Sequence, residues 1–217
     1  MTPDSVTDRR VDRLQDPLEY ERGFWSRGRS RVCGVDEVGR GPLAGPVLVC
    51  AVVLPVDLHV EGARDSKKLS RDARRARCRD ILDRVPDGDV SLGAASVREI
   101  ERLNILGATR LAMRRALEAL AAPWDHLVID GLPMKGVPDH DAVVGGDDRV
   151  HSIACASIVA KVVRDDLMRR LAVRYPVYGW ERNAGYGTVD HREAITRHGA
   201  TPHHRRSFLG VQYGLDL

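Results

Sequence analysis

Short apolar runs alternate with longer amphipathic stretches along most of the chain. The runs 31–35 (RVCGV) and 47–54 (VLVCAVVL) are rich in β-branched residues, which predicts strands. The second run is apolar on both faces, as expected for a strand inside a sheet. Further strands are predicted at 90–94, 126–130 and 142–147.

Helical spacing of apolar residues marks the segments between these strands. Ser70 is placed to cap one helix, and Ser96 with Glu99 has the spacing of a capping box at the start of another. Pro176 stops the longest helical pattern. The predicted helices cover 70–85, 96–122 with a break near 104–107, 153–175, and 190–198 with Gly199 as C-cap. This order predicts an α/β fold with a mixed central β-sheet flanked by helices, and a helical C-terminal portion from about residue 176.

The first 29 residues differ from the rest. They carry six acidic and six basic side chains and little apolar periodicity, so we expect a flexible N-terminal extension (1–29) before one domain (30–217). The longest apolar run, 47–54, is too short to cross a bilayer, and no secretory signal precedes it. We therefore expect a cytoplasmic protein without membrane contact. No heptad pattern or docking stripe is evident, which leaves a monomer as the default.

Charge and cysteine content narrow the classes further. The net charge is only +3, but residues 161–217 carry ten Lys and Arg against six Asp and Glu. This asymmetry fits a phosphate-facing surface, although a solvated helical face has the same composition. The four cysteines are far apart and form no C-x-x-C pair, which argues against a zinc site or a disulfide framework and favours buried free thiols.

Acidic residues follow three of the predicted strands. Asp36 and Glu37 follow the first, Asp130 ends 126–130, and Asp147 ends 142–147. Neighbouring strand ends in an α/β sheet converge on one crevice, where four carboxylates would repel each other unless cations lay between them. Mg²⁺ or Mn²⁺ suits such oxygen ligands, and a pair of these ions suits phosphodiester hydrolysis. An aspartate after a strand is also an ordinary turn residue.

Other acids are expected to lie outside this crevice. Asp148 neighbours Asp147 and makes the fourth ligand ambiguous. Asp165 and Asp166 fall on the long predicted helix, where we expect them to face solvent.

Several segments of the chain resemble one known family. The stretch DEVGRGPLAGPV, residues 36–47, resembles the signature of the type 2 ribonucleases H, ribonuclease HII. Further blocks are similar to family blocks in the same order: DSKKLS (65–70), LNILGAT (103–109), VIDG (128–131), GDDRVHSIACASIVAKVVRD (146–165), GYGT (185–188) and HGATPHHRRSF (198–208). A lone Asp-Glu pair is a weak signal, whereas seven ordered blocks are a strong one.

The resemblance implies a ribonuclease H-like fold and an endoribonuclease. Such an enzyme hydrolyses RNA in RNA–DNA hybrids and cuts on the 5′ side of single ribonucleotides in duplex DNA, leaving a 3′-hydroxyl and a 5′-phosphate. Its role would be ribonucleotide removal in DNA replication and repair. By this resemblance Asp36, Glu37, Asp130 and Asp147 correspond to the four acids that hold two Mg²⁺ or Mn²⁺ ions and catalyse cleavage.

The resemblance also assigns substrate contacts. Gly39, Arg40 and Gly41 match the turn whose backbone reads the ribose 2′-hydroxyl, and glycine lets the backbone approach the sugar. Tyr186 matches a tyrosine that stacks on that sugar. Without the family resemblance, the glycines at 39 and 41 equally suit an ordinary tight turn, and Tyr186 equally suits a residue that anchors a loop.

Basic and hydroxyl residues complete the expected substrate site. Lys67 and Lys68 match a basic pair that contacts the nucleic-acid backbone, although solvated charges at a helix start have the same pattern. Ser157 and Lys161 are one helical turn apart, so we expect them to contact the same phosphate. The block containing His203, His204, Arg205 and Arg206 is expected to be partly structural.

Departures from the family pattern and rival interpretations remain. Gly145 and Ala184 stand where many relatives have lysine, which removes two possible phosphate contacts.

The sister type, ribonuclease HIII, carries an extra N-terminal domain that about 30 residues are too few to form. The alternatives are a nuclease of the same fold that acts on DNA and a non-catalytic nucleic-acid-binding protein.

Overall fold

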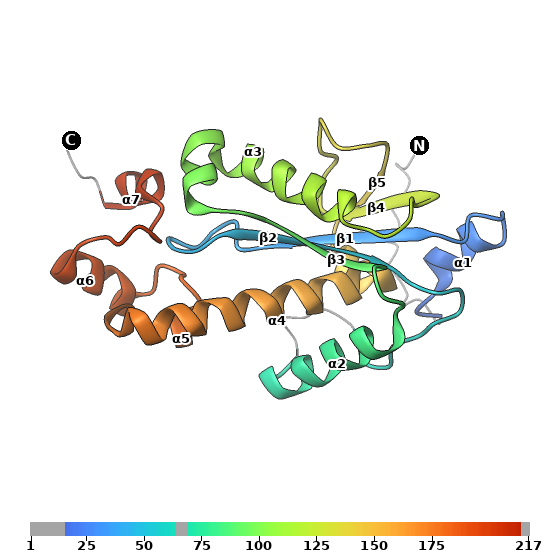
Figure 1. The fold of residues 1–217 in the computed structure, drawn as a ribbon, viewed down its shortest axis with the longest axis horizontal. Helices are drawn as coiled ribbons and strands as arrows, with labels where there is room; N and C mark the ends of the chain where they lie inside the picture. Colours follow the sequence, from blue (N-terminus) through green and yellow to red (C-terminus); the bar gives the residue numbers. More distant parts are fainter. Residues whose placement is uncertain (1–15, 64–68, 214–217) are drawn as a thin grey trace, which may run out of the picture.

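A mixed β-sheet forms the centre of the protein in the computed structural model, which describes residues 16–63 and 69–213. Within these residues the sheet has five strands in the order β3-β2-β1-β4-β5 (Figure 1). The strands are β1 (Val32–Val38), β2 (Val47–Val53), β3 (Val90–Ala95), β4 (His126–Asp130) and β5 (Asp141–Val143). β1 pairs antiparallel with β2 and parallel with β4, and this mixed arrangement confirms the predicted fold class.

Helices cover both faces of the sheet (Figure 1). α3 (Val97–Glu118) packs on one face, and α4 (His151–Arg174) lies across the other, with α2 (Arg71–Arg84) packed beside it. Ser70 caps α2 by accepting a hydrogen bond from Ala73 N, and Ser96 with Glu99 forms the predicted capping box of α3. Asn104, with φ 55°, provides the predicted break within α3.

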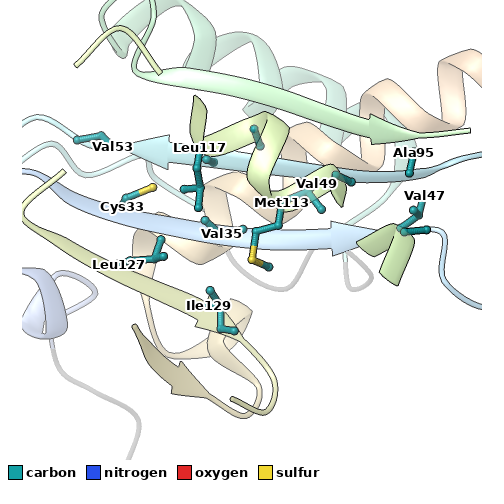
Figure 2. Packing of buried hydrophobic residues seen from close by; sticks show 14 of the residues in the cluster. Cys33, Val35, Val47, Val49, Val53, Ala95, Met113, Leu117, Leu127 and Ile129 are labelled. Atoms are coloured by element: carbon teal, nitrogen blue, oxygen red, sulfur yellow. The ribbon is translucent and has the colours of Figure 1, made fainter. Parts of the chain in front are cut away.

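Side-chain alternation along β1 assigns its residues to the two faces. Cys33 and Val35 point toward α3 and join the core around Met113 and Leu117 (Figure 2). Gly34 and Asp36 therefore face α4. A Cβ on Gly34 would lie 2.4 Å from the carbonyl carbon of Ser152, so the missing side chain lets the first turn of α4 lie directly on β1.

A second apolar core lies between the sheet and the helices α4 and α2. It includes Cys50 and Val52 of β2 and Cys155 and Ile158 of α4. β2 is buried along its whole length, as predicted from its uninterrupted apolar sequence. All four cysteines are buried free thiols, which confirms that prediction too.

The C-terminal portion is helical, as predicted. It contains η2 (Pro176–Tyr178), α5 (Trp180–Asn183), α6 (Val189–His198) and α7 (Arg206–Tyr213). α6 begins one residue earlier than predicted, because the Thr188 side chain accepts a hydrogen bond from His191 N and is the N-cap. Within the described residues, no helix is long and apolar enough to cross a membrane.

The N-terminal segment differs from the prediction. Residues 16–29 include α1 (Glu19–Trp25), whose Glu21 is fully buried and accepts hydrogen bonds from Ser152 N (2.7 Å) and Oγ (2.8 Å) at the start of α4. The Tyr20 hydroxyl donates to Asp141 of β5 over 2.8 Å. This part of the expected flexible extension is therefore docked on the domain, and residues 1–15 lie outside the described residues.

Candidate active site

Two neighbouring parallel strands bring the first acids together. β1 and β4 pair Val35 with Ile129, so Asp36 and Asp130, the next residue on each strand, lie side by side. Asp36 does not end its strand, as the sequence had suggested, because β1 continues through Val38 in its pairing with β2. Its side chain is only 8% exposed, since it faces α4.

A tight turn brings the fourth acid to this position. The predicted strand 142–147 is wrong beyond Val143, because Gly145 adopts φ 66° and η1 (Gly146–Asp148) follows. Gly146 N donates a 2.7 Å hydrogen bond to Asp130 Oδ1, which fastens the turn to β4. Asp147, 8% exposed, thus lies in a turn bound to Asp130 rather than at a strand end, whereas Asp148 is exposed.

The electrostatics of Asp36 reflect this gathering of acids. Its pKa is raised to about 8, chiefly by burial and in addition by the negative charges of Glu37 and Asp130. The hydroxyl of Ser157, on α4, donates a hydrogen bond to the carboxylate and partly opposes the rise in pKa. Asp36 therefore carries a negative charge only at considerable cost when no cation is present.

The donor set suits a hard divalent cation in its chemistry. All four side chains offer carboxylate oxygens, which Mg²⁺ and Mn²⁺ prefer. Across 16–63 and 69–213, however, no three Asp, Glu, His or Cys side chains are arranged to hold an ion. The oxygens instead meet protein donors: Asp36 Oδ1 accepts from Glu37 N (2.7 Å), Glu37 Oε1 from Arg40 Nη1 (3.1 Å), and Asp130 Oδ1 from Gly146 N. Bringing three of these carboxylates onto one ion therefore requires side-chain movement from this arrangement.

The turn after β1 lies next to the acids. Gly39 adopts φ 93° and is buried, whereas Arg40 and Gly41 are exposed. A Cβ on Gly41 would lie 3.8 Å from Cε1 of Tyr186, so the tyrosine ring borders the turn. The Tyr186 side chain is 44% exposed and available to a ligand.

Two buried arginines hold this turn through its backbone. Arg205 donates to the carbonyl oxygens of Gly39 (2.6 Å), Arg40 (2.9 Å) and Gly45 (2.8 and 3.0 Å). Arg164, also fully buried, donates to the carbonyls of Ala44, Pro46 and Ala184 over 2.9–3.1 Å. Each guanidinium joins chain segments that are remote in sequence.

Comparison with known proteins identifies the family. The family model described as Ribonuclease HII matches residues 33–211. This chain belongs to the ribonuclease HII family. It is 54% identical over 195 residues to the ribonuclease HII of Thermosynechococcus vestitus, covering 88% of this chain and 90% of that one. It is 53% identical over 199 residues to that of Ruegeria pomeroyi, covering 91% and 84%.

Solved structures agree with this assignment. The crystal structure of the ribonuclease H2 from Pyrococcus horikoshii OT3 superposes with a TM-score of 0.66 and 25% identity, covering 82% of this chain and 93% of that one. Ribonucleases HII are metal-dependent endoribonucleases with ribonuclease H activity on RNA–DNA hybrids, and membership places this protein among them.

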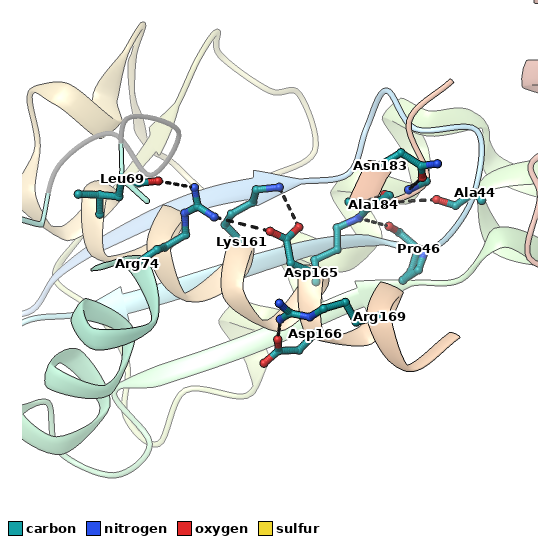
Figure 3. A network of polar contacts seen from close by, with 12 residues as sticks. Ala44, Pro46, Leu69, Arg74, Lys161, Asp165, Asp166, Arg169, Asn183 and Ala184 are labelled. Carbon is teal, nitrogen blue, oxygen red and sulfur yellow. Dashed lines mark hydrogen bonds and ion pairs between the residues drawn. The ribbon is translucent and has the colours of Figure 1, made fainter. Parts of the chain in front are cut away.

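Ser157 and Lys161 do not point to a common position in this ribonuclease HII. Ser157 is buried against Asp36, whereas Lys161 Nζ donates to Asp165 over 2.8 Å (Figure 3). Asp165 and Asp166 are partly buried in ion pairs with neighbouring basic side chains and do not simply face solvent, contrary to expectation; the partners are Lys161, Arg74, Arg75 and Arg169. Lys67 and Lys68 lie outside the described residues.

No sequence pattern identifies Arg164, Arg205 and His191 as buried residues. Arginine side chains are usually exposed. The partners of Arg164 and Arg205 are backbone carbonyls, which carry no sequence signal. Only the placement of Arg205 in the HHRRSF block indicated a structural role.

Proposed function

We propose that this ribonuclease HII cuts the phosphodiester bond on the 5′ side of a ribonucleotide, both in RNA–DNA hybrids and at single ribonucleotides in duplex DNA, leaving a 3′-hydroxyl and a 5′-phosphate. Its cellular role would then be ribonucleotide removal during DNA replication and repair. The observation that carries the proposal is the meeting of Asp36 and Asp130 on paired strands beside the 39–41 turn and Tyr186.

The four acids would hold the divalent ions. We assign Asp36 and Asp130 to positions shared by two Mg²⁺ or Mn²⁺ ions, with Glu37 and Asp147 completing one position each. When bound, the ions supply activation of water and stabilisation of the leaving oxygen. The Ser157 hydroxyl orients the Asp36 carboxylate through the hydrogen bond between them.

Recognition of the ribose is assigned to the other side of the site. The backbone of Gly39, Arg40 and Gly41 would meet the 2′-hydroxyl, which distinguishes RNA from DNA. The clamp of Arg205 on the carbonyls of Gly39 and Arg40 supports this, because it leaves the turn a fixed backbone path. Tyr186 would stack on the sugar beside this turn.

Contacts with the phosphate backbone are assigned to basic residues. Lys67, Lys68 and Lys161 remain proposed substrate contacts, and Lys161 must leave Asp165 to make one. The cytoplasmic location and the monomeric state expected from the sequence stay predictions.

Cleavage of an end-labelled duplex with one ribonucleotide tests the proposal, with Mg²⁺, Mn²⁺ or a chelator present. We expect a metal-dependent cut immediately 5′ of the ribonucleotide and none in an all-DNA duplex. Cutting of the all-DNA duplex would favour a DNA nuclease, and failure to cut any hybrid would favour a non-catalytic binding protein.

Adjacent aspartates provide a matched pair of variants for the site. Asp147→Asn should abolish cleavage, because we assign its buried carboxylate to one of the ion positions, whereas Asp148→Asn, which changes an exposed acid, should cleave nearly as the unaltered enzyme does. The reverse result would show that the fourth acid is misassigned.

A further inference from the structure

A pair of buried histidines lies beneath the loop that carries Tyr186. His191, in the first turn of α6, is 0% exposed, and His204 is 2% exposed. Burial lowers the pKa of both imidazoles, that of His204 to about 4. Neither belongs to the acid cluster.

Hydrogen bonds determine the tautomer of each ring. The indole nitrogen of Trp180 can only donate, and it lies 3.0 Å from His191 Nε2, so Nε2 is an acceptor. The proton of neutral His191 is therefore on Nδ1, which donates to the Tyr186 carbonyl oxygen over 2.8 Å.

His204 extends the chain of hydrogen bonds by one residue. Its Nδ1 accepts from Thr201 N (2.9 Å) and faces Thr201 Oγ1 at 3.0 Å, so its proton is on Nε2. That Nε2–H points to His191 Nε2, 3.1 Å away, and shares this acceptor with Trp180. The polar atoms of both buried rings are thus partnered with both histidines neutral.

This chain ends on the backbone of the tyrosine proposed to contact the ribose. The Tyr186 carbonyl also accepts from Thr188 N (2.9 Å), and Tyr186 N donates to Asn183 O (2.9 Å). The residue is 44% exposed, and the orientation of its backbone sets the direction of the Cα–Cβ bond and so the positions that the ring can reach. A side chain that fixes this carbonyl also fixes the approach of the ring to Gly41.

We propose that His191 is a positioning residue for ribose binding: held by Trp180 and His204, it orients the backbone of Tyr186 so that the ring meets the sugar. The inference rests on the proposed role of Tyr186. His191 itself contacts neither substrate nor metal and acts only through the tyrosine.

A double-mutant cycle between His191 and Tyr186 tests this. The variants are His191→Leu, Tyr186→Ala and both together, with kcat and KM measured on the duplex that contains one ribonucleotide. We expect His191→Leu to raise KM and lower kcat/KM by about three- to tenfold, the factor corresponding to one ordinary hydrogen bond. Tyr186→Ala should lower kcat/KM at least as much, and the double variant should be no worse than Tyr186→Ala alone.

His151 provides the matched control. It is also buried and accepts one backbone hydrogen bond, from Val60 N over 2.9 Å. It begins α4, whereas Gly185, beside the tyrosine, approaches Met168 near the other end of that helix. His151→Leu should lower the thermal midpoint as His191→Leu does and leave kcat/KM nearly unchanged. Should His191→Leu fail to fold, His191→Gln replaces it in the cycle, because the glutamine amide can accept from Trp180 in place of Nε2 but has no donor at the position of Nδ1.

The outcomes separate the two proposals. Unaltered kcat/KM in His191→Leu, or losses that multiply in the double variant, would overturn the positioning role while leaving Tyr186 as a substrate contact. A Tyr186→Ala enzyme with full activity would overturn the proposed ribose contact and the positioning role together. Equal loss of kcat/KM in His151→Leu would assign the effect of His191 to stability alone.

Discussion

Replacing Asp36 with asparagine is expected to stabilise the metal-free protein while it abolishes cleavage. The carboxyl is buried beside Glu37 and Asp130, and its pKa is raised to about 8 from an ordinary value of about 3.9. Asparagine carries no charge and keeps an oxygen that can accept from Ser157. The charge that suits the site to a cation thus destabilises the fold when no cation is bound.

The raised pKa determines both the sign and the size of the effect. The folded state binds the Asp36 proton more tightly than the unfolded state does, so the raised pKa costs no stability below pH ~4, where both states are protonated. Between pH ~4 and ~8 the cost grows by about 1.4 kcal/mol per pH unit. At pH 7 it is on the order of 4 kcal/mol, a large part of the roughly 5–15 kcal/mol that stabilises a typical domain.

Urea unfolding in EDTA across pH 5 to 8 measures this cost. The gain in unfolding free energy of Asp36→Asn over the unaltered protein should increase with pH and should shrink when Mg²⁺ or Mn²⁺ is added, because the ion stabilises only the carboxylate. Asp83→Asn, at an exposed acid on α2, should change stability by less than about 0.5 kcal/mol at every pH. A pH-independent difference, or a less stable Asp36→Asn protein in EDTA, would refute the reasoning.

Three further predictions concern packing and buried charge. Gly34→Ala should destabilise the protein by more than about 2 kcal/mol in urea unfolding, because its Cβ would meet the α4 backbone, whereas Gly23→Ala in open space should stabilise it by about 0.5–1 kcal/mol. Arg205→Lys should lower the free energy of unfolding by at least about 2 kcal/mol and raise KM, since lysine cannot reach all three carbonyls. Arg206→Lys, at an exposed position, should change neither quantity. Equal effects of the two substitutions would contradict the role of Arg205 in holding the turn. Burial raises the pKa of Glu21, so its contribution to stability falls as pH rises above ~4.3. Glu21→Gln should therefore reduce the dependence of the unfolding free energy on pH between pH 5 and 8. An unchanged dependence on pH would contradict this.

Much of the fold was predictable because local signals agreed with tertiary packing. β2 is an unbroken apolar run that could only be an interior strand, and the caps Ser70 and Ser96 stand where α2 and α3 begin. Asp36 and Asp130 could be placed together because parallel strand ends meet at one edge.

The missed features depend on contacts that sequence patterns do not encode. Two glycines before Asp147 suit a strand end and a tight turn equally, and only the bond from Gly146 N to Asp130 selects the turn. α1 was not predicted because its apolar residues alternate with charges and its buried Glu21 meets Ser152, 131 positions away.

The fixed path of the loop after β1 has a consequence for engineering. Arg164 and Arg205 grip main-chain oxygens there, and Arg205 reaches Gly39 across 166 positions of the chain. The shape of the loop is thus specified by residues outside it and hardly by the side chains that the loop displays. A library diversified at the exposed Arg40 should retain the loop backbone, which makes this position a suitable place to alter which sugar the enzyme accepts.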